Sequence, residues 1–280
     1  EGAIIVNLEK YNLGVWVALR SDETVLYSAK DLALARKKFS DFKIDKSIHV
    51  VGSAQKLYFY QLFKVLELMS FKKKENFVYL PVSEVRFPWG KMSSRTGDNV
   101  LYSEFKKEMF ELALKEIKQR EKLLEKEAEA RAIAITIAAI KYQMLKQDVN
   151  KNLIFNKEES LRFEGDTGPY LLYTYARAKS ILRKSKSSSK KSGEISEKEK
   201  SLILKLARFP EIVKKSHEAL APNLIANYSF SLSQKFNEFY HAEKVIGSES
   251  ELFRLKLVEA FAQVLKNALN LLGINTLEKM

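Results

Sequence analysis

Two cations and three hydroxyl groups are close together in the segment KMSSRTG, from Lys91 to Gly97. The segment follows Pro88-Trp89-Gly90, so we expect it to form a loop. Such side chains can gather around phosphate groups, and a lysine there can neutralise the charge that grows as pyrophosphate leaves. By composition alone, an ordinary basic surface loop is the better explanation.

A second candidate site consists of Tyr27, Asp31 and Gln55. A carboxylate pairs well with a guanidinium group, and a tyrosine hydroxyl and a glutamine amide could complete a polar pocket. Each residue also has a structural explanation. Asp31 ends the capping-box pattern SAKD, which is the better explanation for this residue taken alone. Gln55 could bond free backbone groups in the first turn of a helix, and Tyr27 could end a strand.

A third candidate is the segment GDTGPYLLYTYAR, which ends at Arg177. On a helix, Tyr170, Tyr173 and Arg177 share one face at positions i, i+3 and i+7. Aromatic rings and a guanidinium group on a common face can stack unpaired bases and clamp phosphates. Periodicity alone favours a helix that packs through its tyrosines.

These candidates lie in a basic chain of 280 residues, which is long enough for two domains. Lysine and arginine number 48 against 35 aspartate and glutamate, a net charge of +13. This excess suits a polyanionic partner, either nucleic acid or an anionic membrane, although a basic protein without such a partner is an equal alternative. No apolar run reaches membrane-spanning length, so we expect no membrane partner.

Cysteine is absent, which excludes disulfides and thiolate zinc sites and fits a reducing compartment. The histidines His49, His217 and His241 do not pair at metal-ligand spacing, so we expect no metal site. The N-terminus is not a signal peptide and begins almost inside a strand, so we expect it to be a cut through a larger polypeptide.

An α/β part followed by an all-α part is the architecture that would position the candidates. Strands are expected at 3–8, 15–19, 25–27, 47–51, 77–81 and 85–87. Helices are expected at 31–39, 54–69, 105–147 (one helix or a pair), 169–183, 197–207, 210–220, 222–243 and 249–272. The polar stretch 183–200 is expected to be a loop.

The segment KMSSRTG resembles the KMSKS signature of class I aminoacyl-tRNA synthetases. Lys91, Met92 and Ser93 match its first three positions, whereas Ser94 replaces the usual second lysine and Arg95 follows. In that family the loop closes on ATP and stabilises the transition state of amino-acid adenylation. The resemblance implies that Lys91 is catalytic and that Lys91, Met92 and Ser93 contact ATP.

The blocks SDETVLYSAKDLALARKKF and IHVVGSAQKLYFYQLF resemble those with which arginyl-tRNA synthetases hold substrate arginine. Tyr27, Asp31 and Gln55 match the aromatic, aspartate and glutamine positions of that family in type and spacing. Glu23 departs from a common glycine, which affects a turn. Tyr58 departs from the histidine that is common after the glutamine, and this departure could alter contacts in the active site.

The helix that starts near Gly168 is similar to the first helix of the arginyl-type (DALR) anticodon-binding domain. The resemblance implies that Tyr170, Tyr173 and Arg177 contact the anticodon stem and loop of tRNA. A tyrosine on a later helix and the C-terminal methionine contribute in that family, and Tyr240 and Met280 match them.

The resemblance covers essentially the whole chain, in the right order. It implies the second half of a Rossmann-like class I catalytic domain (1–105), a helical connection (106–160) and an all-α anticodon-binding bundle (161–280). The other class I signature, HIGH, lies upstream of residue 1 in that family, so we expect a missing N-terminal half that is either truncated or a separate chain.

The implied function is ATP-dependent ligation of L-arginine to tRNA(Arg) through arginyl-adenylate, with Mg²⁺ accompanying ATP. We expect a cytoplasmic monomer that is inactive without the missing half. The alternative is a non-catalytic tRNA-binding fragment or paralogue, which the absent HIGH half favours. The presence of Tyr27, Asp31, Gln55 and Lys91 argues against it.

Overall fold

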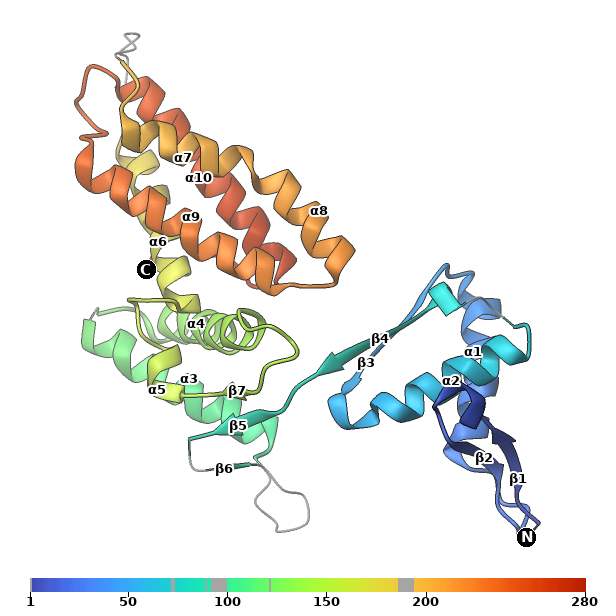
Figure 1. Cartoon of the computed structure of the whole chain (residues 1–280). Coiled ribbons are helices and arrows are strands. Elements are labelled where there is room, and N and C mark those ends of the chain that lie inside the picture. Colours follow the sequence, from blue (N-terminus) through green and yellow to red (C-terminus); the bar gives the residue numbers. More distant parts are fainter. Residues whose placement is uncertain (1, 72–73, 89, 92–99, 121, 186–193) are drawn as a thin grey trace. The chain divides into compact units, whose positions relative to one another are not determined.

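The chain folds into two units, Glu1–Glu84 with Val149–Lys151, and Val85–Asp148 with Asn152–Met280 (Figure 1). The computed structural model describes all residues except 1, 72–73, 89, 92–99, 121 and 186–193. The two units are described separately below.

The first unit combines an antiparallel hairpin, a parallel strand pair and two helices. The strands are β1 (Ile4–Asn7), β2 (Val15–Leu19), β3 (Ser47–Gly52) and β4 (Phe77–Val82), with β1 paired to β2 and β3 paired to β4. The helices are α1 (Tyr27–Phe42) and α2 (Lys56–Leu68), with short 3-10 turns η1 (Glu9–Tyr11), η2 (Ser53–Gln55) and η3 (Lys74–Asn76).

Helix α2 holds the first unit together because it is apolar on two sides. Its residues Phe59, Leu62, Phe63 and Leu66 recur at helical spacing and pack against α1 and β4. On another side, Val65 contacts the hairpin through Leu8 and Trp16. The first turn of α2 is therefore fixed relative to α1, which carries two of the candidate residues.

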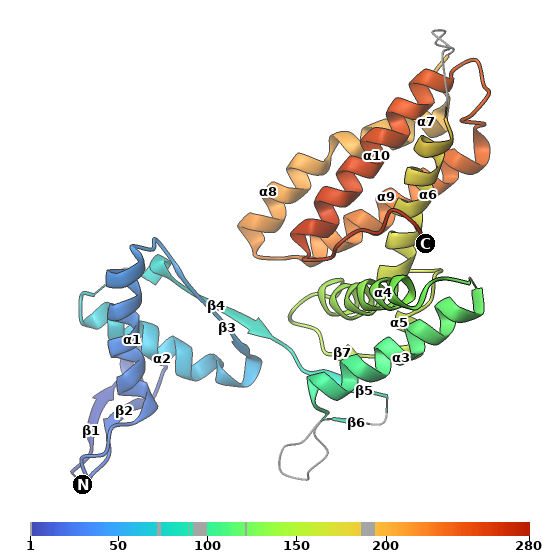
Figure 2. The ribbon, with the colours of Figure 1, turned by 180° about the vertical axis from the view of Figure 1, so that it is seen from behind.

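The second unit is mainly helical and includes a small three-stranded sheet in the order β6-β5-β7 (Figures 1 and 2). Its strands are β5 (Val85–Phe87), β6 (Gly90–Lys91) and β7 (Leu153–Ile154). Its helices are α3 (Tyr102–Arg120), α4 (Glu125–Leu145), α5 (Lys157–Ser160), α6 (Gly168–Lys184), α7 (Glu197–Ala207), α8 (Phe209–Ala219), α9 (Asn223–Ala242) and α10 (Glu251–Leu271).

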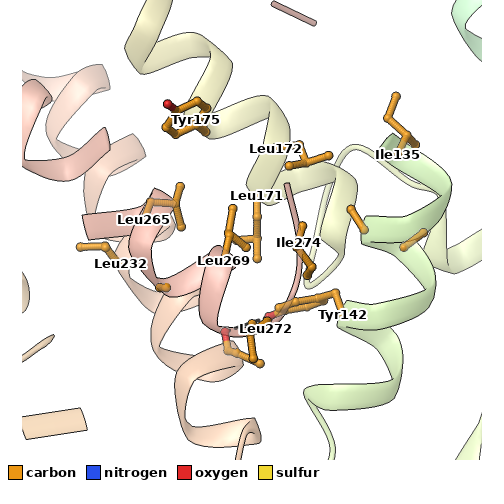
Figure 3. Close-up of a cluster of buried hydrophobic side chains, with 14 of the residues drawn as sticks. Ile135, Tyr142, Leu171, Leu172, Tyr175, Leu232, Leu265, Leu269, Leu272 and Ile274 are labelled. Atoms are coloured by element: carbon orange, nitrogen blue, oxygen red, sulfur yellow. Dashed lines mark hydrogen bonds between the residues drawn. The ribbon is translucent and has the colours of Figure 1, made fainter. Parts of the chain in front are cut away.

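Helix α6 reaches from the α3–α4 pair into the bundle formed by α7 to α10 (Figures 1 and 2). Figure 3 shows Leu171 and Leu172 of α6 between α4 and α10, where both are fully buried. The side chain of Thr167 accepts a hydrogen bond from the backbone of Tyr170, and Pro169 occupies the first turn. The Thr167 cap and Pro169 fix the start of α6.

The loop before α6 is tied to α4 by a partly buried hydrogen-bond network. The Tyr142 hydroxyl is completely buried and donates to Oδ1 of Asp166 at 2.6 Å. Lys146 Nζ donates to the backbone oxygen of Asp166, also at 2.6 Å. Burial, and then the nearby Asp166 charge, raise the pKa of Tyr142 above its ordinary value, so the hydroxyl remains a donor.

The expected strand at 25–27 is wrong in one respect. Val25 makes only an isolated bridge to Leu19, and Tyr27 already begins α1. The Leu26 carbonyl accepts hydrogen bonds from the Ala29 and Lys30 amides, so the backbone turns helical one residue before the strand pattern ends.

The other expected elements are confirmed to within a few residues at their ends. The segment 105–147 is a helical pair, α3 and α4, rather than one helix. Within the expected loop 183–200, residues 186–193 lie outside the described part of the chain. The three-part division at residues 105 and 160 concerns domains of the family and stays a prediction.

We predict that Gly168→Ala destabilises the second unit. A Cβ atom at this position would lie 2.2 Å from the backbone oxygen of Ala138 in α4, and a backbone atom cannot rotate away. We expect a loss of about 1–3 kcal/mol in unfolding free energy by urea titration, typical of forced overpacking. Ser180→Ala, at a half-exposed position on α6, serves as the control. Equal unfolding free energies of the two variants would show that α4 and α6 can move apart without loss of stability, which would contradict the prediction.

Candidate functional sites

Asp31 and Tyr27 lie together where the first turns of α1 and α2 meet. Tyr27 is the first residue of α1, and Asp31 follows one turn later. Tyr58, in the first turn of α2, donates its hydroxyl to Oδ2 of Asp31 at 2.5 Å. The ring of Tyr27 lies 4.9 Å from the ring of Tyr58 between centroids. The structure therefore unites two of the three residues predicted for this pocket and adds Tyr58.

The electrostatics of this pocket suit a cation. Burial, and then the hydrogen bond to Asp31, raise the pKa of Tyr58 above its ordinary value, so Tyr58 stays a neutral donor. Asp31 is half-exposed and keeps Oδ1 for another partner, while Tyr27 is 65% exposed at the rim. A carboxylate beside two aromatic rings can bind a planar cation through an ion pair and ring contacts.

The capping explanation for Asp31 is wrong. The N-cap of α1 is Leu26, and no side chain caps this helix. Ser28, which would begin the capping box, donates instead to the Val17 carbonyl at 2.6 Å. Asp31 points to α2, because its hydrogen-bond partner is Tyr58.

Gln55 ends the 3-10 turn η2 and is the N-cap residue of α2. Its side chain makes no capping hydrogen bond, so the expected backbone role is absent too. Gln55 is exposed, three residues before Tyr58, and no hydrogen bond joins it to Tyr27 or Asp31 within the part of the chain that is described.

The KMSKS-like segment starts on a strand of the second unit. The backbone of Lys91 pairs with Arg86 in the antiparallel β5–β6 pair, and β5 runs parallel to β7. Met92 and Ser93, predicted to contact ATP, lie outside the described residues, and only the backbone of Lys91 is described.

The predicted common face of Tyr170, Tyr173 and Arg177 is present on α6, and α9 completes it. Arg177 Nη1 donates to Oδ1 of Asn237 at 2.8 Å, and Asn237 Nδ2 donates to the Tyr170 hydroxyl at 2.8 Å. The Arg177 guanidinium carbon lies 4.9 Å from the ring centroid of Tyr173 and 5.6 Å from that of Tyr240. We call these five residues the aromatic–arginine cluster.

Arg177 is held inside this cluster by hydrogen bonds and cation–π contacts. Because Asn237 donates to the Tyr170 hydroxyl, that hydroxyl can direct its own proton to another acceptor. Tyr173 and Tyr240 are 38% and 37% exposed, so each offers ring surface to a partner. The cluster therefore combines stacking surfaces with a cation whose position is fixed.

Two open hollows adjoin Arg177. One, of about 370 Å³, is lined by Phe163, Glu164, Tyr170, Tyr173, Arg177, Asn237 and His241. The other, of about 330 Å³, is lined by Arg177, Ser180, Ile181, Lys184, Tyr240, Glu243, Lys244, Val245 and Ile246. Aromatic walls and lysines at such hollows are compatible with unpaired bases and their phosphates.

Met280 is the fifth residue predicted to contact tRNA. It is half-buried and packs against the helical core. The segment before it runs along α6, because Glu278 pairs with Lys179 at 3.2 Å and its backbone oxygen accepts a hydrogen bond from Arg183 at 2.9 Å. The structure unites Tyr240 with Arg177, and among the described residues it shows no hydrogen bond between Met280 and the cluster.

Asn237 is the residue of this site that sequence reasoning missed. It lies 60 positions from Arg177 along the chain, so helical periodicity could not connect them. Its place in the aromatic stretch FNEFY was the one available signal.

Metal and membrane features are not found where the chain is described. No group of three or more His, Asp or Glu side chains in the described ranges could hold a metal ion. None of the helices described is both long enough and apolar enough to cross a bilayer.

Comparisons with known proteins match two successive stretches of the chain, whose bounds differ from those of the two structural units. Residues 1–157 match the family "tRNA synthetases class I (R), catalytic domain", and residues 171–280 match the "DALR anticodon binding domain". The chain is 36% identical to an arginine–tRNA ligase of Bacteroides thetaiotaomicron and 39% identical to one of Clostridium botulinum. Both alignments cover 100% of this chain and 49% and 50% of the relatives, so the chain spans about half their length.

Solved structures show the same relationship. The arginyl-tRNA synthetase of Thermus thermophilus aligns with a TM-score of 0.85 at 26% identity, over 100% of this chain and 54% of that one. That of Plasmodium falciparum also gives 0.85, at 24% identity over 100% of this chain and 49% of the other, which supports the fold alone.

Proposed function

Since the chain belongs to the arginyl-tRNA synthetases of class I, we propose that it takes part in ATP-dependent ligation of L-arginine to tRNA(Arg). One observation carries this proposal: an arginine-type catalytic match at 1–157 is followed in order by an anticodon-binding match at 171–280. A ligase that joins arginine to tRNA would use the first part for the reaction and the second to recognise its RNA substrate.

The proposed reaction has two steps. The carboxylate of arginine attacks the α-phosphorus of ATP, which gives arginyl-adenylate and releases pyrophosphate. A hydroxyl of the terminal ribose of tRNA(Arg) then takes the arginyl group and releases AMP. ATP would enter as its Mg²⁺ complex, and Lys91 would stabilise negative charge on the leaving pyrophosphate, together with Met92 and Ser93 at the nucleotide.

Arginine would bind at the pocket between α1 and α2. The Asp31 carboxylate would pair with the guanidinium group, and the exposed Tyr27 ring would cover it. Gln55, whose side chain makes no capping bond, would turn to the rest of the substrate. The free Oδ1 of Asp31 and its position beside two rings support this assignment.

The first half of a class I catalytic domain is the partner that the parallel strands of the first unit would need. Parallel sheets are normally covered on both faces and contain more than two strands. Here β3 pairs with β4, and Ile48 and Val50 of β3 remain 45% and 61% exposed. We infer that this half packs on β3 and supplies the remaining wall of the ATP site, whether it belongs to the same polypeptide or to another.

Binding of tRNA without catalysis is the second candidate function. All members of the aromatic–arginine cluster come from α6 and α9, so the cluster is complete without the other half of a catalytic domain. The net charge of +13 suits RNA in either case.

Arginine-dependent ATP–pyrophosphate exchange in the presence of tRNA decides between these functions. We expect exchange when the chain is combined with the first half of the catalytic domain, and none with the chain alone, because one wall of the ATP site is then absent. Absence of exchange with both halves present, together with intact tRNA binding, would leave only the binding function.

We predict that Asp31→Ala raises the arginine KM in this exchange by about a hundredfold, because a guanidinium group would lose its charged partner. The Kd for tRNA should not change, since the aromatic–arginine cluster lies in the other unit. Asp41→Ala is the matched control: Asp41 lies on the same helix and pairs with Lys37 at 2.8 Å. An unchanged arginine KM in Asp31→Ala would refute this pocket.

We predict that Tyr173→Ala weakens tRNA binding by about 1–3 kcal/mol, the contribution of one base stacked on an aromatic side chain. Tyr173→Phe should bind almost as well as the unaltered chain, because the ring and its contact with Arg177 remain. The affinity, measured by filter binding, should fall steeply with added salt. Equal affinities of the Ala and Phe variants, or affinity that is insensitive to salt, would contradict this site.

A further inference from the structure

Tyr58 gives Asp31 a fixed hydrogen-bond donor on one side. Its hydroxyl lies 2.5 Å from Oδ2, at the short end of the range for a hydroxyl that donates to a carboxylate. Within the described chain, Tyr58 is the hydrogen-bond partner that the structure gives Asp31. This contact joins α1 to α2 across 27 positions of sequence.

The packing around Tyr58 holds its ring in place. The ring lies 5.2 Å from that of Phe59, which is buried in the α1–α2 core, and 4.9 Å from that of Tyr27. Tyr58 itself is half-buried. Its hydroxyl is therefore a rigid point to which the carboxylate is attached.

A fixed donor matters because the terminal torsion of an aspartate is otherwise broad. With Oδ2 bonded to Tyr58, the plane of the Asp31 carboxylate is set, while Oδ1 and the remaining lone pair of Oδ2 stay available. A guanidinium group is a planar fork that gains two parallel hydrogen bonds only when it meets a carboxylate in the matching plane. An ammonium group is a compact point charge and needs no such plane.

We propose that Tyr58 is a positioning residue that fixes the Asp31 carboxylate and thereby makes the pocket prefer a guanidinium over an ammonium side chain. The inference rests on the proposed function, because it assumes that arginine is the substrate at Asp31. It goes beyond that function by naming Tyr58 as the residue that lets the site discriminate between arginine and lysine, whose side chains have the same charge.

The test compares L-arginine with L-lysine as ligands of the chain combined with the first half of the catalytic domain. Isothermal titration calorimetry gives the Kd of each amino acid for the unaltered protein and for Tyr58→Phe, which removes only the hydroxyl. We expect the arginine Kd to rise about tenfold, and the lysine Kd to change less than about twofold, because only the oriented bond is lost.

Tyr60→Phe is the matched control, since Tyr60 is on the same helix, is 43% exposed and makes no hydrogen bond among the described residues. Its ratio of arginine to lysine affinity should equal that of the unaltered protein. Circular dichroism verifies the fold of each variant. If Tyr58→Phe is unfolded, Tyr58→Leu replaces it and should lose the preference in the same way, because it also lacks a donor. Tyr58→His is the rescue variant and should keep the preference, because an imidazole N–H can donate to the same carboxylate.

A fall in the affinity ratio in a folded variant that lacks a donor at position 58, with the ratio retained in Tyr58→His, supports the inference. Equal weakening of both ligands in the variant that lacks the donor, or no change in it, overturns the role of Tyr58 and leaves the proposed function intact. An unaltered protein that binds neither amino acid overturns both.

Discussion

The close approach of α6 to α4 at Gly168 is the constraint on which the second unit depends. The backbone of Ala138 occupies the space that a side chain would need there, so a residue without Cβ is required. Once the helices meet at this distance, Tyr142 can reach Asp166 from α4 and fix the loop that leads into α6. The direction in which α6 enters the bundle follows from these contacts.

Helix α6 is the element that links the core of the second unit to the aromatic–arginine cluster. Its buried side, with Leu171, Leu172 and Ala178, supplies part of the continuous core shown in Figure 3. Its other side presents Tyr173 and Arg177, and α9 adds Asn237 and Tyr240 to them. The position of the cluster is thus set by the core, because the two faces belong to one rigid helix.

The first unit repeats this relationship at a smaller scale. Contacts between α1 and α2 through residues such as Ala35 and Phe59 bring the first turns of both helices together. Asp31 and Tyr58 meet there as a consequence, and one oxygen of the half-exposed carboxylate accepts a hydrogen bond. In both units an apolar interface between helices lies behind a polar site. This packing holds the polar side chains within hydrogen-bond distance of one another.

The sequence by itself determined the local structure and the family. Helical periodicity and Pro169 located α6, and the i, i+3, i+7 spacing placed Tyr170, Tyr173 and Arg177 on one face. Local signals suffice there because every contact spans only a few residues. Only the tertiary structure decided that Asp31 bonds Tyr58 instead of capping its helix, and that Asn237 joins Arg177 to Tyr170. Those contacts cross 27, 60 and 67 positions, and the packing of separate helices, which no local pattern records, brings them together.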